Sequence, residues 1–186
     1  MENEVLRALF QRRSHRAFSP VQLSDQELDA LVQSGMTSPS ANNHQPWHFS
    51  VVQNQGLLDD ISAESARIAM TQPEDTRNPR FNAPSFHVFY HAPTVVFISS
   101  DSALPLKAID CGIAVQSIAL AAESMGLGSV ILGLPRLAFE GGARNLLEKA
   151  LDIPEGYSFT IAIAIGHPLD RKEPPEHKPG KVSYIR

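Results

Sequence analysis

Residues Phe159–Ile165 read FTIAIAI, an alternation of large and small apolar side chains. Successive side chains of a strand point to opposite faces of a sheet, so a strand that is apolar at every position is covered on both faces. The stretch therefore predicts a central strand. Three shorter segments are typical of further strands, namely Trp47–Val51, Thr94–Ser99 and Val130–Leu132.

Segments with helical spacing of apolar residues separate these strands. The longest predicted helix runs from about Leu106 to Met125, and its centre is apolar on nearly all sides, which predicts burial on several sides. The other predicted helices cover Val5–Phe10, Ser24–Gly35 with a capping box at its start, Leu57–Ile68 and most of Leu137–Leu151. We therefore expect an α+β fold of the three-layer α/β/α type, with a small central mixed sheet flanked by helices.

Length, charge and cysteine content limit the class of protein. A chain of 186 residues fits one domain, and we expect a single domain over residues 1–186. The formal net charge of −4 argues against nucleic-acid binding, which needs a basic face. The sole cysteine, Cys111, has no partner for a disulfide, and no apolar run approaches the ~18 residues of a membrane span. We expect a cytoplasmic protein without nucleic-acid or membrane partners.

Most familiar catalytic motifs are absent from the sequence. The glycines of Gly126–Gly133 precede a strand instead of following one, which excludes the dinucleotide-binding fingerprint. His44 with His48, and His87 with His91, have i,i+4 spacing, but zinc needs three or four converging ligands. We therefore expect no metal site, and we interpret Cys111 as a buried structural thiol.

Three arginines and a serine are concentrated in the segment Arg12–Arg16, which reads RRSHR. Guanidinium groups this close repel one another unless an anion satisfies them, and their forked donors match a phosphate. Taken alone, the segment is explained equally well by a solvated surface cluster.

A polar loop, Ser38–Trp47, reads SPSANNHQPW and precedes a predicted strand. Its hydroxyls, amides and backbone groups can hydrogen-bond the edge of a heteroaromatic ring, although an ordinary turn would have the same composition. A second irregular segment, Thr71–Pro84, is either a cover for a substrate pocket or a surface loop.

The two polar segments together, RRSxR and then PSAxNxQPW, resemble the nitroreductase family of FMN-dependent oxidoreductases. The similarity continues in order through Asp110–Gly112, Met125–Ser129, Ile153–Tyr157 and Ala164–Pro168. Any one of these pieces is weak, but the ordered set spans nearly the whole chain.

The resemblance implies a homodimer that holds two FMN molecules at the subunit interface. The long helix from Leu106 would lie in that interface, and the C-terminal strand Val182–Ile185 would be exchanged with the partner. The implied cofactor-binding residues are Arg12, Arg13, Ser14 and Arg16 at the phosphate and ribityl chain; Pro39, Ser40, Ala41, Asn43 and Gln45 of the other subunit at the flavin ring; Leu132, Gly133 and Leu134 near N5; and the tail cation Lys178.

The resemblance also implies the reaction. Hydride would pass from NADH or NADPH through flavin N5 to a nitroaromatic, quinone or similar small-molecule acceptor, by a ping-pong mechanism. The chemistry would be carried by the flavin, so we assign no catalytic side chain. The alternative is an FMN-binding protein for storage or sensing, without turnover.

Overall fold

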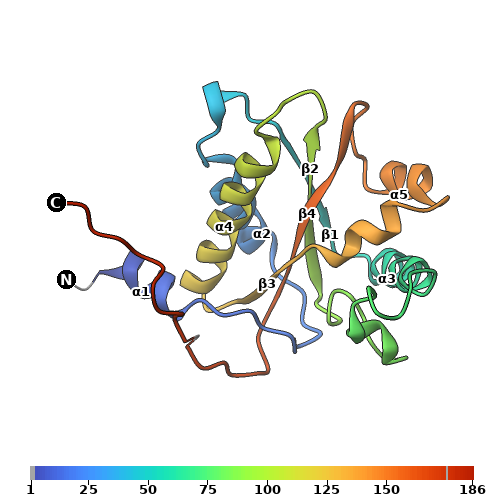
Figure 1. Ribbon diagram of the computed structural model, residues 1–186, viewed down its shortest axis with the longest axis horizontal. Coiled ribbons are helices and arrows are strands. Elements are labelled where there is room, and N and C mark those ends of the chain that lie inside the picture. The colour runs from blue at the N-terminus through green and yellow to red at the C-terminus, as the bar shows by residue number, and fades with distance from the viewer. Residues whose placement is uncertain (1–2, 175) are drawn as a thin grey trace.

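The computed structural model of the chain describes residues 3–174 and 176–186. Its centre is a four-stranded sheet in the order β1-β2-β4-β3 (Figure 1). The strands are β1 (Trp47–Val52), β2 (Thr94–Asp101), β3 (Gly128–Leu132) and β4 (Tyr157–Gly166). The predicted central position of β4 is confirmed. All three strand pairings are antiparallel, whereas a mixed sheet was expected; the one parallel contact is an isolated bridge from Ser14 to Ser129.

Alternation along β4 divides its side chains between two apolar cores. Ala162 and Ala164 belong to one core, while Ile163 and Ile165 belong to the other, and all four are fully buried. Neighbouring β2 alternates in the same way. The sheet is therefore covered on both faces, as the sequence predicts.

Helices form the two outer layers of the fold (Figure 1). One face of the sheet carries α2 (Asp25–Met36) and α4 (Lys107–Ser124), with α1 (Glu4–Gln11) packed on α4. The other face carries α3 (Gln55–Ala69), η3 (Leu134–Phe139) and α5 (Arg144–Ala150). Two short 3₁₀ turns, η1 (Ala41–Asn43) and η2 (Pro79–Asn82), lie in the connections. The three-layer α/β/α prediction is confirmed.

The helix expected over Leu137–Leu151 is divided into η3 and α5. The break falls at Gly141, where a Cβ atom would lie 2.7 Å from Ile68 Cδ1 and 2.8 Å from Glu64 Oε1. This close approach to α3 requires glycine, and glycine disfavours an unbroken helix.

One face of α4 is buried and the other is open to solvent in the single chain. Cys111, Ala114 and Ile118 are fully buried, whereas Ile109 is 62% and Ile113 is 38% exposed. The predicted burial on several sides is therefore wrong for one chain, because the sheet and α2 cover only the inner face. Beyond the part that α1 contacts, the described residues leave the apolar side chains of Ile109 and Ile113 exposed on the outer face.

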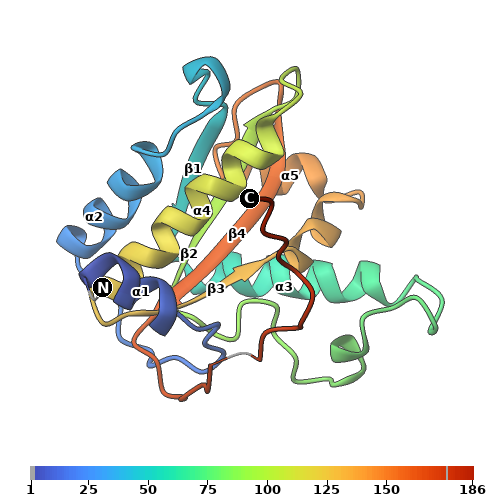
Figure 2. The same ribbon diagram turned by 60° about the vertical axis from the view of Figure 1, so that its left-hand side comes forward.

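The C-terminal segment leaves the body of the domain and ends on the side of α1 (Figures 1 and 2). Val182, Tyr184 and Ile185 are strongly exposed, and no strand forms over residues 176–186. A strand needs a neighbour for its backbone hydrogen bonds, and this segment pairs with no strand among residues 3–174. Its exchange with a partner and the single-domain assignment stay predictions.

The predicted capping box at the start of α2 is confirmed, and it provides a test of the fold. The backbone N–H of Ser24 donates to Glu27 Oε2 at 2.7 Å, and the backbone N–H of Glu27 donates back to Ser24 Oγ at 3.4 Å. We expect Ser24→Ala to lower the free energy of unfolding by about 1 kcal/mol. Urea unfolding measures this, and Gln26→Ala in the same exposed turn should change it by less than about 0.5 kcal/mol. Equal effects of the two substitutions would contradict the capping role.

Candidate functional site

The segment Arg12–Arg16, called the cationic segment below, leaves α1 and lies against the start of β3. The backbone N–H of His15 donates to the carbonyl of Ser129 at 3.0 Å, and Ser14 forms the isolated bridge to the same residue. Strand β3 is an edge of the sheet. The sheet thus anchors the cationic segment through its backbone and leaves the arginine side chains available.

The arginines of the cationic segment have no counter-charges among the residues that the structure describes. Arg13 donates to the backbone carbonyls of Arg12 and Glu173 at 2.8 and 3.2 Å, and Arg16 donates to that of Ser14 at 3.3 Å. Within residues 3–174 and 176–186, no carboxylate lies within 4.0 Å of the three guanidinium groups. Arg16 also lies over the ring of Tyr90, with its guanidinium carbon 5.8 Å from the ring centroid. Three neighbouring cations whose contacts are to uncharged groups are suited to bind a polyanionic group such as a phosphate.

Asp170 holds the cationic segment in place, and sequence reasoning missed it. Its Oδ1 accepts from His15 Nδ1 at 2.7 Å, while its Oδ2 accepts from the backbone N–H of Arg16 at 3.1 Å and lies 3.0 Å from Lys172 Nζ. Burial raises the pKa of this carboxyl, but the hydrogen bonds from His15, Lys172 and Arg16 outweigh burial and set the pKa to about 2. The carboxylate is therefore ionised and already engaged by its own partners.

Gly133 lies at the far end of the same edge strand. It is exposed, and it separates Leu132, the last residue of β3, from Leu134, the first of η3. It lies four residue steps along the strand from Ser129, which corresponds to about 13 Å. The structure therefore places the predicted segment Leu132–Leu134 and the cationic segment along one edge of the sheet.

Residues of α4 hold the polar loop Ser38–Trp47 in place. The backbone N–H of Ala41 donates to Oδ1 of Asp110 at 3.2 Å, and the hydroxyls of Ser38 and Ser117 lie 2.8 Å apart. Sequence reasoning did not predict that Asp110 and Ser117 hold this loop, because these contacts join residues that are 69 and 79 positions apart in the sequence. Within the loop, Ser40 Oγ accepts from the backbone N–H of Gln45 at 2.9 Å.

The same loop has a left-handed backbone at three residues. Asn42, Asn43 and Gln45 have φ values of +50°, +54° and +46°. Asparagine tolerates this region better than most residues, which suits Asn42 and Asn43 to these bends. The bends leave Pro39, Asn43 and Gln45 exposed, so the loop presents its polar groups outward.

The loop and the cationic segment lie at opposite ends of α4 (Figure 1). The loop contacts Asp110 in the first turn of the helix, and the cationic segment contacts Ser129, beyond its last residue, Ser124. The helical rise from residue 110 to residue 124 alone is about 21 Å. One chain therefore does not bring the two predicted parts of the site together.

Lys178 and Cys111 complete the set of predicted residues. Lys178 is exposed in the C-terminal segment and forms no ion pair with any residue that the structure describes. Burial and the neighbouring Asp110 raise the pKa of the Cys111 thiol to about 11. A fully buried, protonated thiol confirms the structural interpretation of Cys111.

His87 and His91 meet Asp59 on the surface, with one potential ligand atom from each within 4.8 Å of the others. The Nδ1 atom of His87 accepts from the backbone N–H groups of Phe89 and His91 at 3.3 and 3.4 Å. Its proton therefore lies on Nε2, which donates to Asp59 Oδ1 at 3.2 Å. The cluster presents a proton donor where a metal would need a lone pair, so this hydrogen bonding does not preform a metal site.

The pKa of Asp170 gives a prediction about stability. Because the folded-state pKa of about 2 lies below the ordinary value of 3.8, the stabilisation is complete above about pH 4 and is lost as the pH falls through about 2. We expect Asp170→Asn to lower the free energy of unfolding by about 1–2 kcal/mol at neutral pH.

Urea unfolding at pH 7 and in acid measures this difference, which should shrink with acidification. Asp29→Asn, a change of the same charge on the exposed side of α2, serves as the control. A difference that persists unchanged in acid would contradict the ion-pair explanation.

The chain is similar to known proteins over most of its length. A protein of Archaeoglobus fulgidus, provisionally named NADH dehydrogenase/NAD(P)H nitroreductase, is 33% identical over 171 residues, which cover 91% of this chain and 88% of the relative. An FMN reductase [NAD(P)H] of Bacillus subtilis is 28% identical over 91% of this chain and 68% of its own. A nitroreductase of Desulfitobacterium hafniense, solved with bound FMN, superposes over all of both chains with a TM-score of 0.94 at 31% identity.

The model of one family covers most of the sequence. Residues 9–167 match the Nitroreductase family, a range that includes the cationic segment, the polar loop, α4 and all four strands. The chain therefore belongs to the nitroreductase family.

Proposed function

We propose that the protein is an FMN-dependent oxidoreductase that uses NADH or NADPH to reduce a small-molecule acceptor, such as a nitroaromatic compound or a quinone. The observation that carries the proposal is the set of three arginines on the β3 edge, which form no ion pair within the described part of the chain. A phosphate monoester carries nearly two negative charges, and it fits forked guanidinium donors.

Each predicted cofactor residue has a role in the proposal. Bound FMN would supply the hydride chemistry, and the chain would bind and orient it. The phosphate and ribityl chain would be held by Arg12, Arg13, Ser14 and Arg16, with Lys178 as an additional cation. The ring would be lined by Leu132, Gly133 and Leu134 of the same chain and by Pro39, Ser40, Ala41, Asn43 and Gln45 of a second chain.

The separation of the two parts supports a homodimer. The cationic segment and the polar loop of one chain lie at opposite ends of α4, where the rise from residue 110 to residue 124 is about 21 Å. In the proposal, the loop that lines the ring therefore comes from another copy. The exposed outer face of α4, with Ile109, and the exposed Val5 and Phe10 of α1 offer an apolar surface for such a partner.

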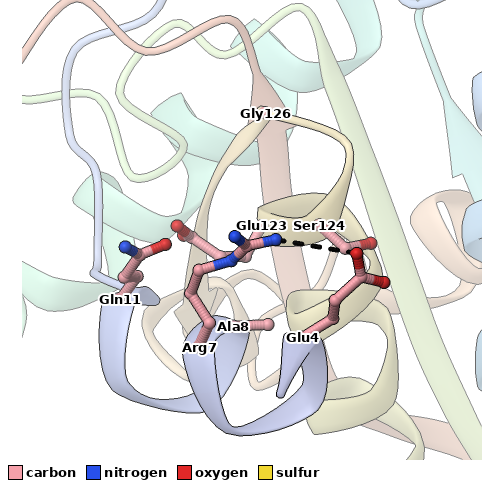
Figure 3. A pocket seen from close by; sticks show the side chains of 7 residues that line it. All are labelled: Glu4, Arg7, Ala8, Gln11, Glu123, Ser124 and Gly126. Carbon is pink, nitrogen blue, oxygen red and sulfur yellow. Dashed lines mark ion pairs between the residues drawn. The ribbon is translucent and has the colours of Figure 1, made fainter. Parts of the chain in front are cut away.

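A hollow beside this surface would receive a further part of the partner. It measures about 320 Å³, lies between α1 and the end of α4, and is lined by polar groups that include Arg7 and Glu4, 3.8 Å apart (Figure 3). Val5, Ala8 and Leu120 extend it as an apolar groove. We propose that the partner's C-terminal segment lies along this groove.

Turnover would use one site in two stages. We propose that the donor leaves before the acceptor binds, which gives ping-pong kinetics, and that the protein works in the cytoplasm. No helix of the described residues is long and apolar enough to cross a membrane. The alternative, FMN binding for storage or sensing, differs in predicting that neither nicotinamide donor reduces the bound flavin.

The visible spectrum tests the proposal. We expect the purified protein to be yellow with bound FMN, and its absorbance to be lost on anaerobic addition of NADH or NADPH. We expect Arg16→Ala to weaken FMN binding by roughly 10- to 100-fold in a fluorescence titration, because a charge-assisted hydrogen bond is lost.

Arg144→Ala, which removes an arginine already paired with Glu148 at 2.8 Å, is the matched control and should bind FMN normally. A yellow protein that resists both donors would favour the storage or sensing alternative, whereas a colourless protein that ignores added FMN would refute the cofactor assignment.

Complementation tests the two-chain site. Arg16→Ala removes the phosphate-binding part, and Ala41→Glu would place a charge in the polar loop. In a mixed dimer of the two variants, one site contains both defects and the other contains none. We expect co-expression, followed by isolation of the mixed dimer with two affinity tags, to restore about half of the FMN bound per dimer. A site built within one chain would give no recovery.

A further inference from the structure

The segment after α3 forms a second hollow, away from the cationic segment in sequence. It measures about 470 Å³, within the range of pockets that hold small molecules. The segment Thr71–Pro84 is folded there into turns and the 3₁₀ turn η2, with Phe81 buried. The lining residues are Ala66, Met70, Glu74, Arg77, Phe81, Asn82, Ala83, Pro84 and Phe86.

Arg77 contributes an unsatisfied cation to this hollow. Its Nε atom is buried without a hydrogen-bond partner, and its Nη1 contacts only the sulfur of Met70, a weak acceptor, at 2.8 Å. No carboxylate of the described residues lies within 4.0 Å of it, although Glu74 lines the same hollow. A buried donor on a charged group is normally satisfied, so an anionic ligand would complete this one.

Aromatic rings give the hollow a second property. The rings of Phe81 and Phe86 meet edge to face with centroids 5.3 Å apart, and Phe86 meets Tyr90 in the same way at 5.8 Å. The guanidinium carbon of Arg16 lies 5.8 Å from the centroid of Tyr90. A continuous row of side chains therefore connects the hollow with the cationic segment.

We propose that this hollow selects electron acceptors that carry one carboxylate on an aromatic ring, with Arg77 pairing with the carboxylate and Phe81 and Phe86 packing against the ring. Glu74 would disfavour ligands with a second negative charge. The proposal deepens the proposed function and rests on it for the reduction step, whereas ligand binding at Arg77 is independent of that step.

Isothermal titration of the oxidised holoprotein, without a nicotinamide donor, tests the binding. The probes are 4-nitrobenzoate and its neutral analogue 4-nitrobenzamide. We expect the carboxylate to bind about tenfold tighter or better, and Arg77→Gln to abolish that preference. Arg80→Gln, which removes an exposed arginine three residues further on, should keep the preference.

Steady-state kinetics with the same compounds test the acceptor role. We expect Arg77→Gln to raise KM for 4-nitrobenzoate about tenfold without changing KM for 4-nitrobenzamide, and Arg77→Lys to keep part of the preference. Unchanged thermal unfolding and FMN content would show that Arg77→Gln remains folded.

The outcomes separate the two proposals. Equal binding of the two compounds by the wild-type protein, or a preference that Arg77→Gln leaves intact, would overturn the site. A binding preference that depends on Arg77 without a matching change in KM would overturn its role in acceptor selection. Failure to reduce 4-nitrobenzoate would likewise overturn that role. Failure of both nicotinamide donors to reduce bound flavin would refute the proposed function, while the titration would still decide on the binding site.

Discussion

Burial of β4 on both faces is the constraint from which the rest of the structure follows. Its isoleucines and alanines enter two separate cores, so apolar helices must cover both sides of a small sheet. With the faces occupied, polar segments are confined to the edges and ends of the sheet. The free edge at β3 is where the cationic segment lies, held by the backbone contact between His15 and Ser129.

The electrostatics of that edge depend on which charges are already paired. Asp170 is satisfied by His15, Lys172 and the backbone of Arg16, so it fixes the segment without neutralising the guanidinium groups. The arginines keep their charge for a ligand. The proposed phosphate site thus combines one engaged carboxylate with three cations that form no ion pair among the described residues, which a count of charges in the sequence does not reveal.

Features encoded by near neighbours were predictable, and those encoded by distant contacts were not. The capping box at Ser24 and the central position of β4 depend on a few adjacent residues, and both are present. The strand directions, the contact of Asp170 with His15 across 155 residues and the row of side chains through Tyr90 depend on how the chain returns on itself. Periodicity records which residues are buried, but not what covers them.

The outer face of α4 is a further case in which the sequence predicts burial without showing what covers the helix. Its apolar residues are typical of a buried helix, yet Ile109 and Ile113 are exposed in the part of the chain that the structure describes. The two parts of the proposed cofactor site are held at opposite ends of this helix, by Asp110 and beyond Ser124. A second copy packed on the exposed face would cover the helix and could bring one copy's loop to the other's cationic segment. In this arrangement, one contact between the two copies would bury the exposed face of α4 and complete the cofactor site, because the same helix also separates the two parts of the site within one chain.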